Sequence, residues 1–99
     1  MDEFQCMYDR MDEISKSFSN QAEVVGQMLQ NLQNHMEDLK PDWIGKGSDA
    51  FFNEMESEVL PAMQRLQAAL EEGGQTTARA NQVIETAEQQ AQGQFTYLA

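Results

Sequence analysis

The chain is divided by the stretch Leu39-Lys40-Pro41-Asp42-Trp43-Ile44-Gly45-Lys46-Gly47-Ser48. Pro41 disfavours helical geometry in the residue before it, and the two glycines that follow interrupt any regular pattern. A connection as short as 41–47 is usual between two antiparallel helices. This stretch therefore predicts a turn, and we expect Ser48 or Asp49 to cap the helix that follows it.

In the segment before the turn, apolar residues recur every seven positions. This repeat is typical of a long helix that packs along one apolar stripe. Position a of the repeat holds Phe4, Met11, Phe18, Val25, Leu32 and Leu39. Position d adds Met7, Ile14 and Met28, and the neighbouring position e adds Tyr8, Ala22, Leu29 and Met36. The repeat predicts one helix over about residues 3–39.

The segment after the turn continues the same kind of repeat. Its apolar positions include Phe52, Met55, Val59, Leu66 and Leu70. This pattern predicts a second helix over about residues 47–92, followed by a tail at 93–99. Pro61 falls inside the pattern and cannot donate a helical hydrogen bond, so we expect a bend there. Gly73-Gly74 is a second weak point, or a place where two backbones approach closely.

Composition supports an all-α protein with a single domain over residues 1–99. Glutamine, glutamate, alanine, methionine and leucine dominate the two repeating segments, and all are good helix formers. The formal net charge is -11, so the surface repels nucleic-acid phosphates and anionic lipids. No apolar run approaches the roughly 18 residues that a membrane span needs. We therefore expect neither nucleic-acid binding nor stable membrane insertion.

A single two-helix hairpin leaves much of each apolar stripe in water, because a chain this small has little core. Four helices shelter the stripes, so the pattern predicts that two chains form an antiparallel four-helix bundle. The repeat positions that we expect to form the core and the dimer interface are Phe4, Met7, Met11, Ile14, Phe18, Val25, Met28, Leu32, Leu39, Phe52, Met55, Val59, Leu66 and Leu70.

Residues that carry chemistry are sparse. His35 is the only histidine, and at position d we expect a partly buried, hydrogen-bonded imidazole; a pH-sensitive interface is the alternative. Cys6 is the only cysteine and has no recognisable catalytic partners. The carboxylates are scattered over polar faces. We therefore predict no catalytic, metal or cofactor site, and a protein that is not an enzyme.

Trp43-Ile44-Gly45 lies in a turn between two long helices, in the middle of a chain of 99 residues. Over essentially the whole chain this arrangement resembles the WXG100 family of the early-secreted-antigen type. The resemblance implies a bacterial substrate of a type VII secretion system, present in the cytoplasm before export and secreted without a cleaved signal peptide. It also implies binding to a second copy or a sister protein, and to the secretion ATPase.

The motif residues themselves have two interpretations each. Trp43 either clamps the hairpin or takes part in recognition, or does both. Gly45 supplies either a backbone conformation that other residues resist or room for the tryptophan ring. Both residues are the turn motif that the resemblance singles out.

Members of the family often carry Tyr-x-x-x-Asp/Glu late in the second helix, and this chain departs from that pattern. Residues 77–81 hold neither the tyrosine nor the acid, and Tyr8 with Asp12 matches the letters only in the first helix. Either a partner supplies the export signal, or features of the dimer and the tail replace it. The residues Phe95, Tyr97 and Leu98 are then either a docking tail or the last contact in the dimer. The alternatives to a homodimeric secreted protein are one half of a heterodimer and an intracellular helical adaptor.

Overall fold

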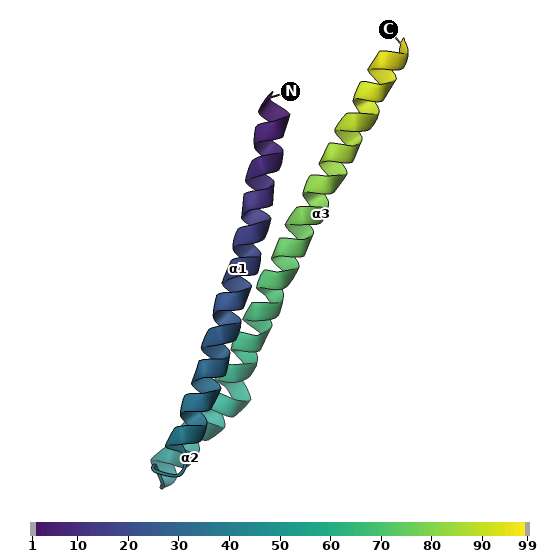
Figure 1. Cartoon of the computed structure of the whole chain (residues 1–99). Helices are drawn as coiled ribbons and strands as arrows, with labels where there is room; N and C mark the ends of the chain where they lie inside the picture. Colours follow the sequence, from purple (N-terminus) through teal and green to yellow (C-terminus); the bar gives the residue numbers. More distant parts are fainter. Residues whose placement is uncertain (1, 99) are drawn as a thin grey trace.

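The structure, a computed structural model, describes residues 2–98, with side chains described for residues 3–94. It consists of helix α1 (Asp2–Leu39), helix α2 (Lys46–Glu54), the π-helix η1 (Met55–Val59) and helix α3 (Leu60–Leu98). No strand occurs in this part of the chain. Figure 1 shows an antiparallel hairpin with the turn at one end and both termini at the other. The predicted all-α hairpin is confirmed.

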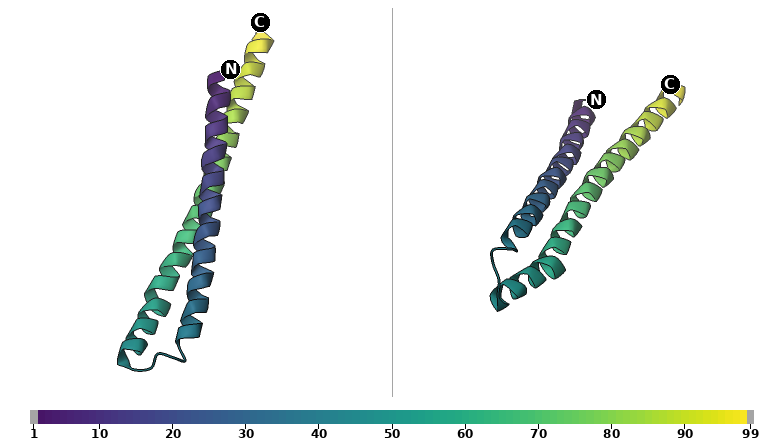
Figure 2. Two further views of the ribbon diagram at one scale, coloured as in Figure 1. Left: turned by 60° about the vertical axis from the view of Figure 1, so that its left-hand side comes forward. Right: turned by 60° about the horizontal axis from the view of Figure 1, so that its bottom comes forward.

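The helices reach further than the repeat predicted. The rod measures 80 × 18 × 14 Å, and α3 continues past the start of α1 at the open end (Figures 1 and 2). The residues 93–98, expected as a tail, are the last turns of α3. Gly93 does not stop the helix, because a single glycine costs only about 1 kcal/mol and good helix formers precede it.

At the expected bend the structure has the π-helix η1, which ends two residues before Pro61. A helical proline has no N–H to donate, and its ring collides with the carbonyl group four residues earlier. In η1 the wider turn removes that collision, and the Leu60 N–H bonds to the Met55 carbonyl five residues back. The helix therefore continues through Pro61 with one extra residue in the turn, which changes the face that earlier residues present.

The turn is held by its backbone and by one serine. The N–H groups of Asp42 and Trp43 both donate to the Leu39 carbonyl, at 3.0 and 3.1 Å. Gly45 has φ 136° and ψ -178°, a conformation that is almost confined to glycine. Among the described residues, no atom lies within 4 Å of where its Cβ would be, so its role is conformational and not to make room for the ring.

The prediction that Ser48 or Asp49 caps the second helix is wrong. Gly45 stands at the N-cap position, and no side chain caps the helix. Ser48 lies in the first turn of α2 and is buried, and its hydroxyl donates to the Trp43 carbonyl at 2.6 Å. The serine thus joins the turn to α2 instead of accepting a hydrogen bond from the free N–H groups at the start of the helix.

The hairpin core lies near the turn. Its buried side chains are Leu29, Met36, Phe52 and Leu60, with Leu32, Met55 and Met63 packed against them. Ala22, which lies farther from the turn on α1, is also buried, with 2% of its surface exposed. On α1 these most buried residues occupy position e of the repeat, one position beyond the d column. The contact between α1 and α3 therefore runs along the a and e columns.

Gly73 and Gly74 lie where α1 and α3 approach closely, and they do not break the helix. A Cβ on Gly74 would lie 3.1 Å from the Ser15 carbonyl oxygen, and one on Gly73 would lie 3.0 Å from the Phe18 ring. The Ser15 hydroxyl also donates to the Gly74 carbonyl at 2.8 Å. Of the two interpretations of this pair, the structure shows the close approach.

Candidate functional site

The hairpin tip holds a cluster of three aromatic rings. The Trp43 ring lies 5.3 Å from Phe51 and 5.9 Å from Phe52, and the two phenylalanines meet edge to face at 5.3 Å. Such tilted arrangements are the favourable ones for aromatic pairs. Trp43 therefore clamps the turn against α2. It keeps 39% of its surface exposed, and its neighbour Ile44 is 87% exposed, so the tip also presents apolar surface outward.

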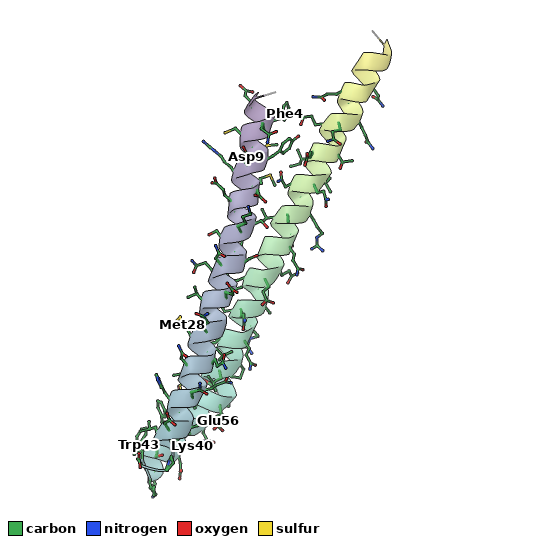
Figure 3. All side chains as sticks on the ribbon, viewed as in Figure 1. Phe4, Asp9, Met28, Lys40, Trp43 and Glu56 are labelled. Atoms are coloured by element: carbon green, nitrogen blue, oxygen red, sulfur yellow. The ribbon has the colours of Figure 1, made fainter. Side chains whose placement is uncertain are left out.

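An ion pair ties α1 to the π-helix beside this cluster. The Lys40 Nζ lies 2.6 Å from the Glu56 carboxylate and 5.4 Å from the centre of the Phe52 ring. Figure 3 shows Lys40, Trp43 and Glu56 gathered at the closed end of the hairpin. Both members of the pair remain about half exposed. The contact therefore positions the tip more than it stabilises the fold.

Polar contacts replace apolar ones at the open end. The Tyr8 hydroxyl donates to Glu88, and the Asn81 amide donates to the Tyr8 carbonyl at 3.1 Å. The amide oxygen of Asn81 is buried and has no partner among the described residues. The two helices are thus joined at this end by directional bonds, with little apolar burial.

A second apolar stripe faces solvent, which we call the open face. It consists of exposed residues on both long helices: Ile14, Val24, Met28, Ala62, Leu66, Ala69 and Val83. Met28 is 55% exposed and Leu66 is 51% exposed. Figure 3 shows Met28 on a side of α1 that does not face α3.

The two halves of the open face lie on the same side of the hairpin. On each helix the exposed stripe is displaced about a quarter turn from the buried one, in the same rotational sense along the sequence. Because α1 and α3 are antiparallel, the same sense of rotation turns both stripes toward one side. The hairpin is therefore a two-helix layer with one apolar face uncovered.

The expected interface residues are divided between these two surfaces. Phe52 is buried, while Met7, Met11, Phe18, Val25, Leu32, Met55, Val59 and Leu70 are half-buried. Those that remain exposed are Phe4, Ile14, Met28, Leu39 and Leu66. The set omitted Ala22, Leu29, Met36 and Leu60, which are four of the five buried apolar residues in the described part of the chain. The burial of Ala22, Leu29 and Met36 could have been predicted from their apolar side chains at position e, which lies beside position a on the helix.

Three further expectations concern single residues. His35 is exposed in the single chain, because the buried column of α1 is e and not d. Its partial burial in a dimer stays a prediction. Cys6 is a free, exposed thiol. The tail residues Phe95 and Tyr97 lie in helical backbone, and Leu98 ends α3. The side chains of these three tail residues lie outside the described ones.

Within the described part of the chain, no group of three or more His, Cys, Asp or Glu side chains is placed to hold a metal ion. The helices of that part include none that is long and apolar enough to cross a bilayer. The features that remain are the aromatic tip and the open face, and both expose apolar side chains to solvent.

A family model described as proteins of 100 residues with WXG matches residues 3–89. The chain belongs to the WXG100 family. The match includes all of α1 except its first residue, the turn with Trp43 and Gly45, and most of α3. No curated protein and no solved structure matches the chain significantly. The WXG100 assignment therefore rests on the family model together with the hairpin and its motif at the tip.

Proposed function

We propose that this WXG100 protein is a substrate of a bacterial type VII secretion system, exported as a folded dimer, and that it acts by binding and not by catalysis. The open face is the observation that carries the proposal. A helical layer with exposed Met28, Leu66 and Val83 is incomplete as a single chain. Uncovered apolar stripes of this length mark a surface for another protein.

Dimerisation covers that face with the same kind of surface. A second hairpin laid antiparallel on the first forms a four-helix bundle, in which each apolar stripe packs against another. The partner is a second copy or a sister WXG100 protein. The matched dimensions of two such rods favour either choice over a small or globular partner.

The aromatic tip is the part we assign to recognition by the secretion ATPase. Ser48 and the two phenylalanines hold Trp43 in place, yet more than a third of the tryptophan surface is exposed. Ile44 adds a second apolar side chain beside it. Clamping and recognition are therefore compatible roles for the same ring.

Export is tested with a tagged copy in a bacterium that has a type VII system, with and without a functional secretion ATPase. We expect the protein in the medium only when the ATPase is active, with a cytosolic marker as the control for lysis. Equal amounts in both media, or retention in the cells of both strains, would exclude the proposed route and favour an intracellular adaptor.

A heterodimer is the second candidate, because residues 77–81 lack the tyrosine and the acid of the usual signal. Light scattering of the protein expressed alone separates the two. A helical species near twice 11.2 kDa indicates a homodimer. A poorly helical monomer indicates that the open face awaits a sister protein that carries the signal.

A further inference from the structure

A ladder of alternating charges borders the open face on α3 and its preceding π-turn. It consists of Glu58, Arg65, Glu72 and Arg79, which are spaced seven residues apart and are all exposed. Residues at this spacing fall on nearly the same edge of a helix. Between them, on the same side, lie Ala62, Ala69, Thr76 and Val83. We call the four charged residues the charge ladder.

The charge ladder complements itself when two copies of α3 run antiparallel. With the centre between Ala68 and Ala69, Glu58 lies opposite the partner's Arg79, and Arg65 lies opposite the partner's Glu72. All four contacts across the twofold axis then join opposite charges. The same alignment brings Leu66 to within two residues, about 3 Å along the rod, of the level of the partner's Ala69. Small residues there allow the two helices to approach closely.

The alignments shifted by one seven-residue repeat bring like charges together. Sliding one helix by a single repeat in one direction places Glu58 opposite the partner's Glu72 and Arg65 opposite its own copy. Sliding it in the other direction places Arg65 opposite the partner's Arg79 and Glu72 opposite its own copy. Like charges repel at such edge positions, and in coiled coils they determine partner and register. The charge ladder therefore disfavours both slipped alignments.

Helix α1 carries an independent pattern with the same property. At the edge of its exposed stripe, spaced seven apart, lie Arg10, Ser17, Val24, Asn31 and Asp38, all exposed. An antiparallel pairing centred on Val24 places Arg10 opposite the partner's Asp38. It also joins the polar Ser17 to the partner's Asn31 and leaves apolar Val24 against its own copy. In this column, each charged residue therefore meets the opposite charge, each polar residue meets a polar one, and the apolar residue meets its own copy.

The fold brings the two centres to the same level of the hairpin. Gly26 faces Gln67 across the contact between α1 and α3, since a Cβ on Gly26 would lie 2.5 Å from the Gln67 amide nitrogen. Because the helices are antiparallel, moving two residues back from Gly26 corresponds to moving two residues forward from Gln67. Val24 therefore lies level with Ala69. One twofold axis perpendicular to the rod satisfies both helices.

We propose that the open face binds a second copy of this chain about that axis, with α1 beside α1 and α3 beside α3. The charge ladder, together with Arg10 and Asp38, selects the chain itself over a sister protein and determines the register. The inference rests on the dimeric part of the proposed function and adds the partner and the alignment. It is independent of the export route.

Charge reversal tests the pairing by sedimentation equilibrium with far-ultraviolet circular dichroism. Arg65→Glu or Glu72→Arg alone replaces two attractions with two repulsions in the dimer, so each weakens dimerisation on the order of tenfold. The double variant restores the opposite pairing and returns the dissociation constant to within about threefold of the original. Glu71→Arg is the matched control, since it makes the same charge change at an exposed position outside the ladder.

Two results would overturn the pairing. Single reversals with the same effect as Glu71→Arg mean that Arg65 and Glu72 do not meet. A double variant as weak as the single ones means that each charge has a different partner. In both cases a stable dimer of the unmodified chain leaves the proposed dimeric function intact.

The register is measured by spin-label distances in Cys6→Ser protein labelled at Ser17→Cys, Val24→Cys or Asn31→Cys, with no label on the ladder. An axis through Val24 predicts the shortest distance at 24. It predicts equal distances at 17 and 31, where the labels are offset by about 21 Å along the rod. Unequal distances at 17 and 31 would exclude this axis. Absence of any dipolar signal, with a monomeric mass, would exclude the homodimer itself.

Discussion

At the scale of single residues, the turn depends on one backbone conformation and one hydroxyl. Gly45 adopts φ 136° with no atom near its Cβ position, so its importance is purely conformational. Ser48 reaches back to the Trp43 carbonyl, and the indole ring then rests on Phe51 and Phe52. The family motif thus consists of Trp43, whose ring packs on the two phenylalanines, and Gly45, which adopts the backbone conformation that the turn requires.

Gly45→Ala is expected to destabilise the folded protein by about 1–3 kcal/mol, because an alanine in this conformation is strained. Urea unfolding followed by circular dichroism measures the change. Gly47→Ala is the control, since Gly47 lies inside α2 with a free Cβ position and an ordinary φ. The control should be neutral or stabilising by up to about 1 kcal/mol. Equal effects of the two changes would contradict this role of Gly45.

At the scale of elements, two irregular features adjust the long helices to each other. The π-helix η1 accommodates Pro61, and Ser48 and Phe52 of the preceding α2 are buried. The Gly73-Gly74 pair allows α3 to approach Ser15 and Phe18 of α1. Proline and glycine are both poorly suited to the interior of a helix. Here the π-turn gives Pro61 a geometry that it fits, and the close approach of α1 requires the missing side chains of Gly73 and Gly74.

Gly74→Ala should destabilise the hairpin by about 1–3 kcal/mol although alanine is the better helix former. The new Cβ would lie 3.1 Å from the Ser15 carbonyl oxygen, which is backbone and cannot move away cheaply. Thermal unfolding at a fixed protein concentration measures the change. Gly93→Ala, with no described atom within 4 Å of the new Cβ, is the control and should raise stability by up to about 1 kcal/mol. A stabilising Gly74→Ala would show that the helices can separate there.

Lys40→Ala tests the connection between the end of α1 and η1. The Lys40 and Glu56 side chains are about half exposed, so the loss should stay below about 1 kcal/mol and should vanish in high salt. Urea unfolding at low and high sodium chloride gives both values. Lys46→Ala, at the exposed start of α2, removes a charge without this ion pair and serves as the control. A loss that persists in high salt would point to packing on Phe52 instead.

At the scale of the whole molecule, the hairpin is a thin layer whose length exceeds its core. Its buried apolar side chains gather near the turn, while polar bonds through Tyr8, Asn81 and Glu88 join the open end. One side of the layer is left apolar. The uncovered side explains why a second hairpin is expected to contribute much of the stability, and why unfolding should depend on protein concentration.

Met28→Glu is expected to weaken the dimer at least tenfold, because each copy loses about 1.5–3 kcal/mol of side-chain burial and gains a charge on the open face. Sedimentation velocity over a concentration series measures the shift toward monomer. Gln30→Glu makes the same charge change at an exposed position of α1 outside the open face, and should leave the equilibrium nearly unchanged. A dimer equally stable in both variants would place the interface elsewhere.

The all-helical class, the turn at Pro41 to Gly47 and the two long helices are predictable from local signals, namely the seven-residue repeat and the turn residues. The column of each repeat that packs inside the hairpin is set by contacts between the helices. Ala22, Leu29 and Met36 are buried while Ile14 and Met28 are exposed, although all five are apolar and belong to one broad stripe. The physical reason is that a wide stripe permits several rotations of a helix. The choice between them depends on contacts made far along the chain, at η1 and at Gly73-Gly74.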